Sequence, residues 1–162
     1  MRRLLLSFFG AGHLRPAPGT WGSLAALPAA YVVHLIGGPF LLVIGAAVLF
    51  ALGTRATRIE TETSDDHDPG WIVIDEVVGQ WIALLPVSIG AMMAGASVLK
   101  LWPGILAAFL FFRLFDIWKP WIIGTADRRG DALGVMLDDV WAGVFAAISV
   151  SVLAVLAHGV MT

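Results

Sequence analysis

The chain has 162 residues, of which 59% are hydrophobic and 14% are charged. Soluble domains carry about 25% charged residues, so this composition indicates an integral membrane protein. We expect one domain that covers residues 1–162. The absence of cysteine excludes disulfides, zinc–thiolate sites and a cysteine nucleophile, and a formal net charge of −2 gives no indication of nucleic-acid binding.

Hydrophobic segments predict an all-α, polytopic membrane bundle of about five helices. They comprise residues 20–37, 39–55, 70–88, 103–119 and 135–157. The Gly37-Gly38-Pro39 turn predicts that the first two form a hairpin, although a re-entrant first arm would leave four spans. We expect Asp68 to cap the third segment, with Pro69 in its first turn. Pro120 should end the fourth segment at Lys119.

Charged residues gather at one end of this predicted bundle. If successive segments alternate in direction, the regions 1–19, 55–76 and 113–139 lie on the same side of the membrane. These regions hold every lysine and arginine except Lys100, and all twelve acidic residues. The positive-inside rule assigns this side to the cytoplasm. The sequence therefore predicts a multi-pass membrane protein with its functional site on the cytoplasmic side.

Two acidic pairs lie near the starts of apolar segments, Asp75 and Glu76 in "WIVIDEVVGQWIAL" and Asp138 and Asp139 in "GVMLDDVWAGVFAA". An unpaired charge at the bilayer centre costs about 2.5–3.5 kcal/mol or more, so such carboxylates need partners. Helical periodicity directs Glu76 and Asp139 into the bundle and places Asp75 nearer the rim. The alternative is that these acids only interact favourably with the helix dipoles.

The stretch "FFRLFDIWKPW" carries Arg113, Asp116 and Lys119 at three-residue steps, which places them on nearly the same side of a helix. One interpretation is an ion ladder that neutralises itself. The functional interpretation is a phosphate clamp, formed by Arg113 and Lys119, beside a carboxylate that can hold a metal.

The loop "GAGHLRPAPGTWGS" leads directly into the first helix. Thr20 and Ser23 can either cap that helix, which is the simpler interpretation, or bind phosphate beside exposed backbone amides. Asp127 lies in a polar loop on the same side of the membrane and is a second-rank candidate. His13 reads as an ordinary interfacial histidine, and the acidic residues at 65–68 read as a solvated turn.

Convergent carboxylates beside arginine and lysine predict a metal-dependent phosphoryl site. Carboxylate oxygens bind Mg²⁺, which usually shares its coordination with a phosphate and with water. Such a site can use a metal-activated water or an aspartyl nucleophile. Because this end of the bundle lies at headgroup depth, the expected substrate is a lipid phosphate.

The motifs "PAPGTWGSLAALP", "WIVIDEVVGQWIAL", "FFRLFDIWKPW" and "GVMLDDVWAGVFAA" together resemble the phosphatidylglycerophosphatase A family of bacteria, in order and spacing. The resemblance implies Mg²⁺-dependent hydrolysis of phosphatidylglycerophosphate to phosphatidylglycerol and phosphate at the inner membrane. The residues expected to hold the metal are Asp75, Glu76, Asp138, Asp139 and Asp116. Those expected in catalysis are Asp116, Asp139 and Glu76. Those expected to bind substrate are Arg113, Lys119, Thr20 and Ser23.

Other functions remain open at this stage. An ion or proton transporter would also use intramembrane carboxylates, but it predicts acids spread through the bilayer. A non-catalytic lipid-binding or assembly protein would need the basic residues without so many acids. A phosphatase of another lipid phosphate fits the same pattern. Beyond membrane lipids, the sequence indicates no partner, and it leaves the oligomeric state undetermined.

Overall fold

The computed structural model describes residues 1–62 and 69–160, and the regular structure in these ranges is entirely helical. In chain order the elements are α1 (Arg2–Leu6), the 3₁₀ helix η1 (Ala11–His13), α2 (Pro18–Thr61), α3 (Ile74–Ala83), α4 (Leu85–Met93), the 3₁₀ helix η2 (Val98–Leu101), α5 (Trp102–Trp118), α6 (Ile122–Asp127) and α7 (Ala132–Val160). Four stretches are long and apolar enough to cross a membrane, namely Pro18–Thr61, Ile74–Met93, Val98–Trp118 and Ala132–Ala157. The prediction of an all-α membrane bundle is confirmed.

Helix α2 folds back on itself at the predicted turn. Gly37 and Gly38 leave helical geometry, and Gly38 has a φ of 59°, a conformation that glycine adopts without the steric cost of a Cβ. Both arms contact the same part of α3. The Trp81 indole donates a 3.1 Å hydrogen bond to the carbonyl of Ala26 in the first arm, and its ring packs on Gly45 in the second. The two arms are therefore antiparallel and supply two of the five predicted segments.

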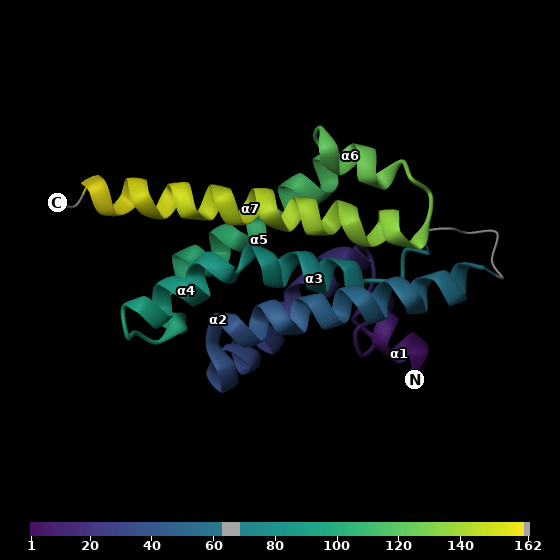
Figure 1. Ribbon diagram of the computed structural model, residues 1–162, viewed down its shortest axis with the longest axis horizontal. Coiled ribbons are helices and arrows are strands. Elements are labelled where there is room, and N and C mark those ends of the chain that lie inside the picture. The colour runs from purple at the N-terminus through teal and green to yellow at the C-terminus, as the bar shows by residue number, and fades with distance from the viewer. Residues whose placement is uncertain (63–68, 161–162) are drawn as a thin grey trace.

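Helix α3 lies at the centre of the bundle, where it packs against both α2 and α7 (Figure 1). Eight of its ten residues are buried. It approaches α7 so closely that a Cβ on Gly143 would lie 2.4 Å from the carbonyl oxygen of Gly79. A Cβ on Gly79 would lie 2.6 Å from the carbonyl oxygen of Asp139. Small residues permit this contact, and the contact holds the middle of α3 against the stretch of α7 from Asp139 to Gly143.

The predicted start of the third segment is wrong. Helix α3 begins at Ile74, five residues after Pro69, while Asp68 lies outside the described residues, as does the acidic cluster at 65–68. The N–H of Val73 instead donates a 2.8 Å hydrogen bond to the carbonyl of Leu6. This contact holds the chain before α3 against the N-terminal segment, so tertiary contacts override the local helix-start signal.

Ion pairs connect the N-terminal helix α1 to the C-terminal end of α2. Glu60 is almost fully buried and accepts from Arg2 at 2.7 Å and from Arg3 at 2.8 Å. Leu6, the last residue of α1, is completely buried. Because the ion pairs join residues nearly sixty positions apart, the sequence pattern gave no sign of them.

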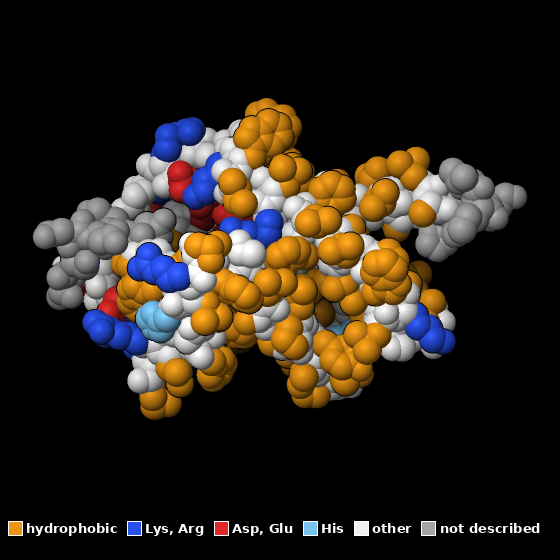
Figure 2. Space-filling model, turned by 180° about the vertical axis from the view of Figure 1, so that it is seen from behind, with side chains coloured by type: hydrophobic (Ala, Val, Ile, Leu, Met, Phe, Trp, Pro, Cys, Tyr) orange, Lys and Arg blue, Asp and Glu red, His pale blue; other side chains and the backbone are white. Residues whose placement is uncertain are grey.

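The surface of the molecule divides into two chemically different halves. On the face shown in Figure 2, most basic and acidic side chains gather over one half, and hydrophobic side chains cover most of the other. Large apolar residues that are at least half exposed include Val32, Leu35, Ile36, Phe40, Ile44, Leu110, Ile148 and Val155. Apolar side chains exposed in this way fit a surface that faces lipid hydrocarbon.

Candidate functional site

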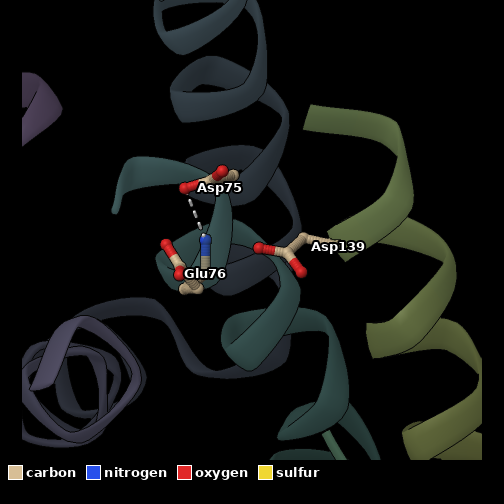
Figure 3. A group of neighbouring side chains, drawn as sticks. All are labelled: Asp75, Glu76 and Asp139. Atoms are coloured by element: carbon tan, nitrogen blue, oxygen red, sulfur yellow. Dashed lines mark hydrogen bonds between the residues drawn. The ribbon is translucent and has the colours of Figure 1, made fainter. Parts of the chain in front are cut away.

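Three carboxylates from α3 and α7 converge between the two helices (Figure 3). One oxygen each from Asp75, Glu76 and Asp139 lies within 4.8 Å of the other two. Asp75 and Asp139 are buried, with 7% and 3% of their surfaces exposed, and Glu76 is partly buried. The expectation that Asp75 lies nearer the rim than Glu76 is therefore wrong. Helix α3 packs against α2, α5 and α7, so Asp75 points into a helix contact and not toward a rim.

Both acidic pairs use the same local geometry. One Asp75 oxygen accepts from the backbone N–H of Glu76 at 3.1 Å, and one Asp138 oxygen accepts from the N–H of Asp139 at 3.0 Å. In α3 this amide lies in the first turn and lacks an intrahelical partner, whereas Asp138 and Asp139 lie in the second turn of α7. Within the described part of the chain, Oε2 of Glu76 and Oδ1 of Asp139 are buried without a hydrogen-bond partner.

This group of oxygens is suited to a divalent cation. Buried polar atoms normally have partners, and three carboxylates in mutual proximity repel one another unless a positive charge lies between them. A donor set made only of carboxylate oxygens favours hard ions such as Mg²⁺. The predicted ligands Asp75, Glu76 and Asp139 thus form a group that could hold a metal ion.

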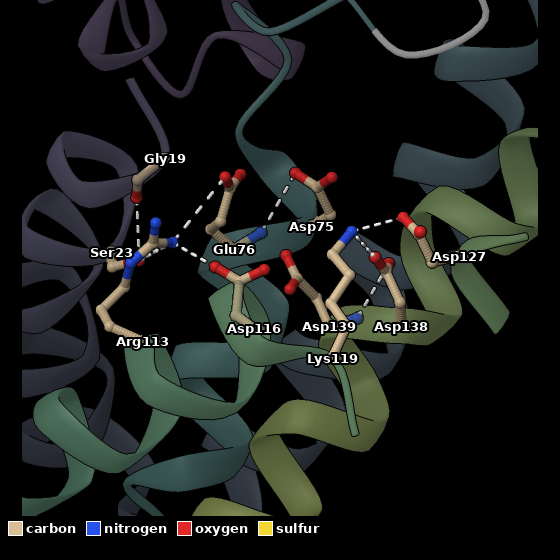
Figure 4. Close-up of polar contacts among 10 residues, drawn as sticks. All are labelled: Gly19, Ser23, Asp75, Glu76, Arg113, Asp116, Lys119, Asp127, Asp138 and Asp139. Carbon is tan, nitrogen blue, oxygen red and sulfur yellow. Dashed lines mark hydrogen bonds and ion pairs between the residues drawn. The ribbon is translucent and has the colours of Figure 1, made fainter. Parts of the chain in front are cut away.

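Arg113 lies on the α5 side of these carboxylates (Figure 4). Its Nη1 forms an ion pair with Asp116, lies 4.0 Å from Oε1 of Glu76 and donates to the Ser23 hydroxyl at 3.4 Å. Ser23 is fully buried and donates in turn to the carbonyl of Gly19 at 2.8 Å. The Nε of Arg113 is buried without a partner among the described residues. This nitrogen is a free donor for an anionic ligand.

Lys119 lies at the end of α5, as predicted, but with a backbone that few lysines adopt. Its φ of 50° and ψ of 51° are left-handed, and Trp121 beyond it has a φ of 47°. Such conformations cost a non-glycine residue roughly 1–3 kcal/mol, and they concentrate at functional sites. They turn the chain into α6 and away from the axis of α5.

The ammonium of Lys119 joins two other helices. It donates to Asp138 of α7 at 2.8 Å and forms an ion pair with Asp127 of α6. Burial lowers the pKa of Lys119, but the hydrogen bonds to these two carboxylates outweigh burial and raise it above its ordinary value. Asp116 pairs with Arg113, so the three charges of α5 do not form a ladder along one helix. Asp127, the second-rank candidate, belongs to this network.

Thr20 and Ser23 do not cap α2, which begins at Pro18 without a side-chain cap. The capping interpretation is therefore wrong for both. Ser23 contacts Arg113, whereas Thr20 is half-buried in the first turn. Gly19 is a position that the sequence reasoning missed, because a Cβ there would lie 2.1 Å from Oε1 of Glu76. Its only signal was its place within the "PGTWGS" motif.

The fold and the site define a helical integral membrane protein with a buried cluster of acids beside two basic side chains. The chain belongs to the phosphatidylglycerophosphatase A family, whose model matches residues 4–154. It is 40% identical to phosphatidylglycerophosphatase A of Haemophilus influenzae, over 91% of this chain and 85% of the relative. It is 35% identical to phosphatidylglycerophosphatase A of Escherichia coli, over 89% of this chain and 78% of the relative.

A third relative carries a different name. A Bacteroides thetaiotaomicron protein, provisionally named as a phosphatidylinositol-3-phosphatase, is 35% identical over 89% of this chain and 87% of its own length. No solved structure matches the chain significantly. The family assignment therefore rests on sequence, and it agrees with the resemblance carried by the four motifs.

Proposed function

We propose that this protein is a phosphatidylglycerophosphatase. It would hydrolyse the terminal phosphomonoester of phosphatidylglycerophosphate and release phosphatidylglycerol and inorganic phosphate. Family membership supports the reaction. The observation that carries the proposal is the cluster of Asp75, Glu76 and Asp139 beside the unpartnered Nε of Arg113, since it pairs a cation site with a phosphate-binding donor.

In this proposal Mg²⁺ is held by Asp75, Glu76 and Asp139, with Asp138 and Asp116 near enough in the network to complete its surroundings. A bound Mg²⁺ would neutralise charge that develops on the phosphoryl oxygens. The other steps fall to the chain's own side chains.

Arg113 would bind two phosphoryl oxygens through Nε and Nη, and its interaction with the Ser23 hydroxyl keeps the guanidinium in position. Lys119 would supply a second positive charge, and Thr20 would contact the substrate from the first turn of α2. Asp116 would either accept a proton from the attacking water or attack phosphorus itself. The bond from phosphorus to the terminal glycerol oxygen would break, and that oxygen would take a proton from water to become the hydroxyl of phosphatidylglycerol. If Asp116 attacks, a second step in which water hydrolyses the aspartyl phosphate would release inorganic phosphate.

We also propose that the single domain lies in the bacterial inner membrane with this site facing the cytoplasm. The distribution of lysine and arginine supports the orientation, because every such residue except Lys100 belongs to the predicted cytoplasmic regions. The distribution of the acidic residues favours a reaction site and argues against a transporter. They cluster at one end, whereas a relay would need them along the whole path.

Phosphate release from the purified protein in detergent–lipid micelles tests this function. We expect release from phosphatidylglycerophosphate with Mg²⁺, almost none with EDTA, and slower release from phosphatidylinositol 3-phosphate and phosphatidate. Absence of Mg²⁺-dependent release from all three lipids would overturn the enzyme proposal. Faster release from the inositol lipid would overturn the substrate assignment alone. Labelled phosphate trapped on Asp116 would identify this residue as a nucleophile.

A further inference from the structure

An apolar cavity of about 360 Å³ lies in the apolar half of the molecule, away from the charged end that holds the candidate site. Its walls include Leu27, Ala30, His34, Leu84, Ser88 and Ile105. His34 Nδ1 and the Ser88 hydroxyl are 2.6 Å apart and satisfy each other by a hydrogen bond. The cavity therefore offers a ligand mainly hydrocarbon surface. Its volume is at the lower end of the roughly 300–1,000 Å³ typical of ligand pockets.

The cavity continues the face of α2 that carries Ser23. Leu27, Ala30 and His34 follow Ser23 at four, seven and eleven residues, which places all four on one stripe of the helix. With a rise of 1.5 Å per residue, the wall extends from roughly 6 Å to roughly 16 Å beyond Ser23. On α5, Ile105 precedes Arg113 by eight residues, or roughly 12 Å. The cavity thus lies beneath the phosphate-binding side of the site.

Figure 2 shows a recess with acidic and basic side chains and a hollow in the hydrophobic half on the same face of the molecule. A phospholipid has the same arrangement, with a phosphate at one end and hydrocarbon chains directed away from it. The depth of the cavity below Ser23 suits an acyl chain that descends from a headgroup bound at Arg113.

We propose that the cavity binds an acyl chain of the lipid substrate. This inference rests on the proposed function, because it places the substrate phosphate at Arg113. An acyl chain in the bilayer is already surrounded by hydrocarbon, so the cavity adds little hydrophobic free energy. Its contribution is to orient the lipid and to hold the phosphate in line with the catalytic carboxylates. Chain length therefore becomes a determinant of specificity.

Substrates of two chain lengths test the inference at a fixed mole fraction in micelles. Ala30→Phe fills the cavity from a buried position, and Leu99→Trp narrows it from a wall residue that is 53% exposed. We expect kcat/KM for dipalmitoyl phosphatidylglycerophosphate to fall about tenfold in both variants, and kcat/KM for the dihexanoyl lipid to change less than about twofold. The matched control is Leu110→Trp, at a position of α5 that is 56% exposed and outside the cavity wall.

Activity on the dihexanoyl lipid also reports whether each variant is folded. If Ala30→Phe does not fold, Leu99→Trp still tests the inference. Equal losses on both lipids in Leu99→Trp, or an unchanged chain-length preference, would overturn the acyl-chain site while leaving the proposed function in place. A wild-type protein inactive on both chain lengths would instead overturn the proposed function.

Discussion

The carboxyl group of Asp139 faces two groups of like charge within 4.8 Å, Asp75 and Glu76. We expect Asp139→Asn to lower phosphate release about 100-fold, a loss typical of damage to a metal site. Without metal, the same substitution should raise the free energy of unfolding by about 1 kcal/mol, because one of the repelling charges is gone. A phosphate-release assay measures the first effect. Thermal unfolding in EDTA and in Mg²⁺ measures the second, and the stabilisation by Mg²⁺ should shrink.

Asp131→Asn is the matched control, since Asp131 is exposed and pairs with Arg129 away from the cluster. It should leave both activity and the Mg²⁺ effect nearly unchanged. If Asp139→Asn were as active as the wild type, Asp139 would have no place in the proposed chemistry.

Lys119 compensates the buried carboxylate of Asp138. We expect Lys119→Met to lower the free energy of unfolding by about 2 kcal/mol, less than the 3–5 kcal/mol of a fully buried pair because Lys119 is 30% exposed. Adding Asp138→Asn to this variant should recover part of the loss, because the uncompensated charge is then removed. Chemical unfolding of Lys119→Met, Asp138→Asn and the double variant gives the coupling free energy between the two side chains. Additive losses would show that the two side chains do not stabilise each other.

The raised pKa of Lys119 also predicts how this contribution depends on pH. The stabilisation is fully present below the pKa of an unfolded lysine, about 10.4, and is lost as pH rises through the higher folded value. The difference in stability between wild type and Lys119→Met should therefore be constant from about pH 8 to 9 and shrink above about pH 10.5. A difference that already shrinks near pH 8 would contradict the raised pKa.

At the level of elements, the contact of α3 with α7 depends on glycine. We expect Gly143→Ala to lower the free energy of unfolding by about 2 kcal/mol and to reduce activity, because its Cβ would lie 2.4 Å from the carbonyl oxygen of Gly79. Gly90→Ala is the control. Its Cβ would meet nothing closer than 3.8 Å, so it should be neutral or gain about 0.5–1 kcal/mol from helix propensity. Similar changes in the free energy of unfolding at both positions would mean that helix propensity, and not the contact with α3, determines the effect of Gly143→Ala.

Helices whose ends are marked by proline or glycine could be predicted from the sequence. The segment 103–119 matches Trp102–Trp118, because Pro120 disfavours further helix, and Gly37 and Gly38 break α2 where expected. Helix α6 has only six residues and was not predicted, since so short an element shows no helical periodicity. The start of α3 was predicted wrongly, because a hydrogen bond to Leu6 decides it.

The sequence predicted which residues come together in the candidate site, but not which way Asp75 faces or which residues Lys119 contacts. The motifs identified Glu76, Asp139 and Arg113 as candidate site residues, because charged residues in apolar helices need partners. A helical wheel placed Asp75 outward, since it assumes a single inward face, and α3 has neighbours on several sides. The bridge from Lys119 to two other helices depends on the left-handed turn, which the sequence does not signal.

For the whole molecule, the proposed orientation can be tested by labelling, because the sequence contains no cysteine. We expect a membrane-impermeant maleimide to label Lys100→Cys in intact cells, and to label Asp131→Cys only after the membrane is opened. Both positions are exposed, so access depends on the membrane and not on the fold. The opposite pattern would place the site outside, and equal labelling of both in intact cells would refute the predicted topology. Phosphate release by both variants verifies folding.

Where Gly79 meets Gly143, main-chain atoms set the separation of α3 from α7, and with it the spacing between Asp139 and the acids of α3. Mg²⁺ binds oxygen at about 2.0–2.1 Å and Ca²⁺ at about 2.3–2.6 Å. Carboxylates on two helices in backbone contact cannot widen to suit the larger ion unless the helices separate. This glycine contact would therefore select ions by radius, and we expect Ca²⁺ to compete with Mg²⁺ only weakly.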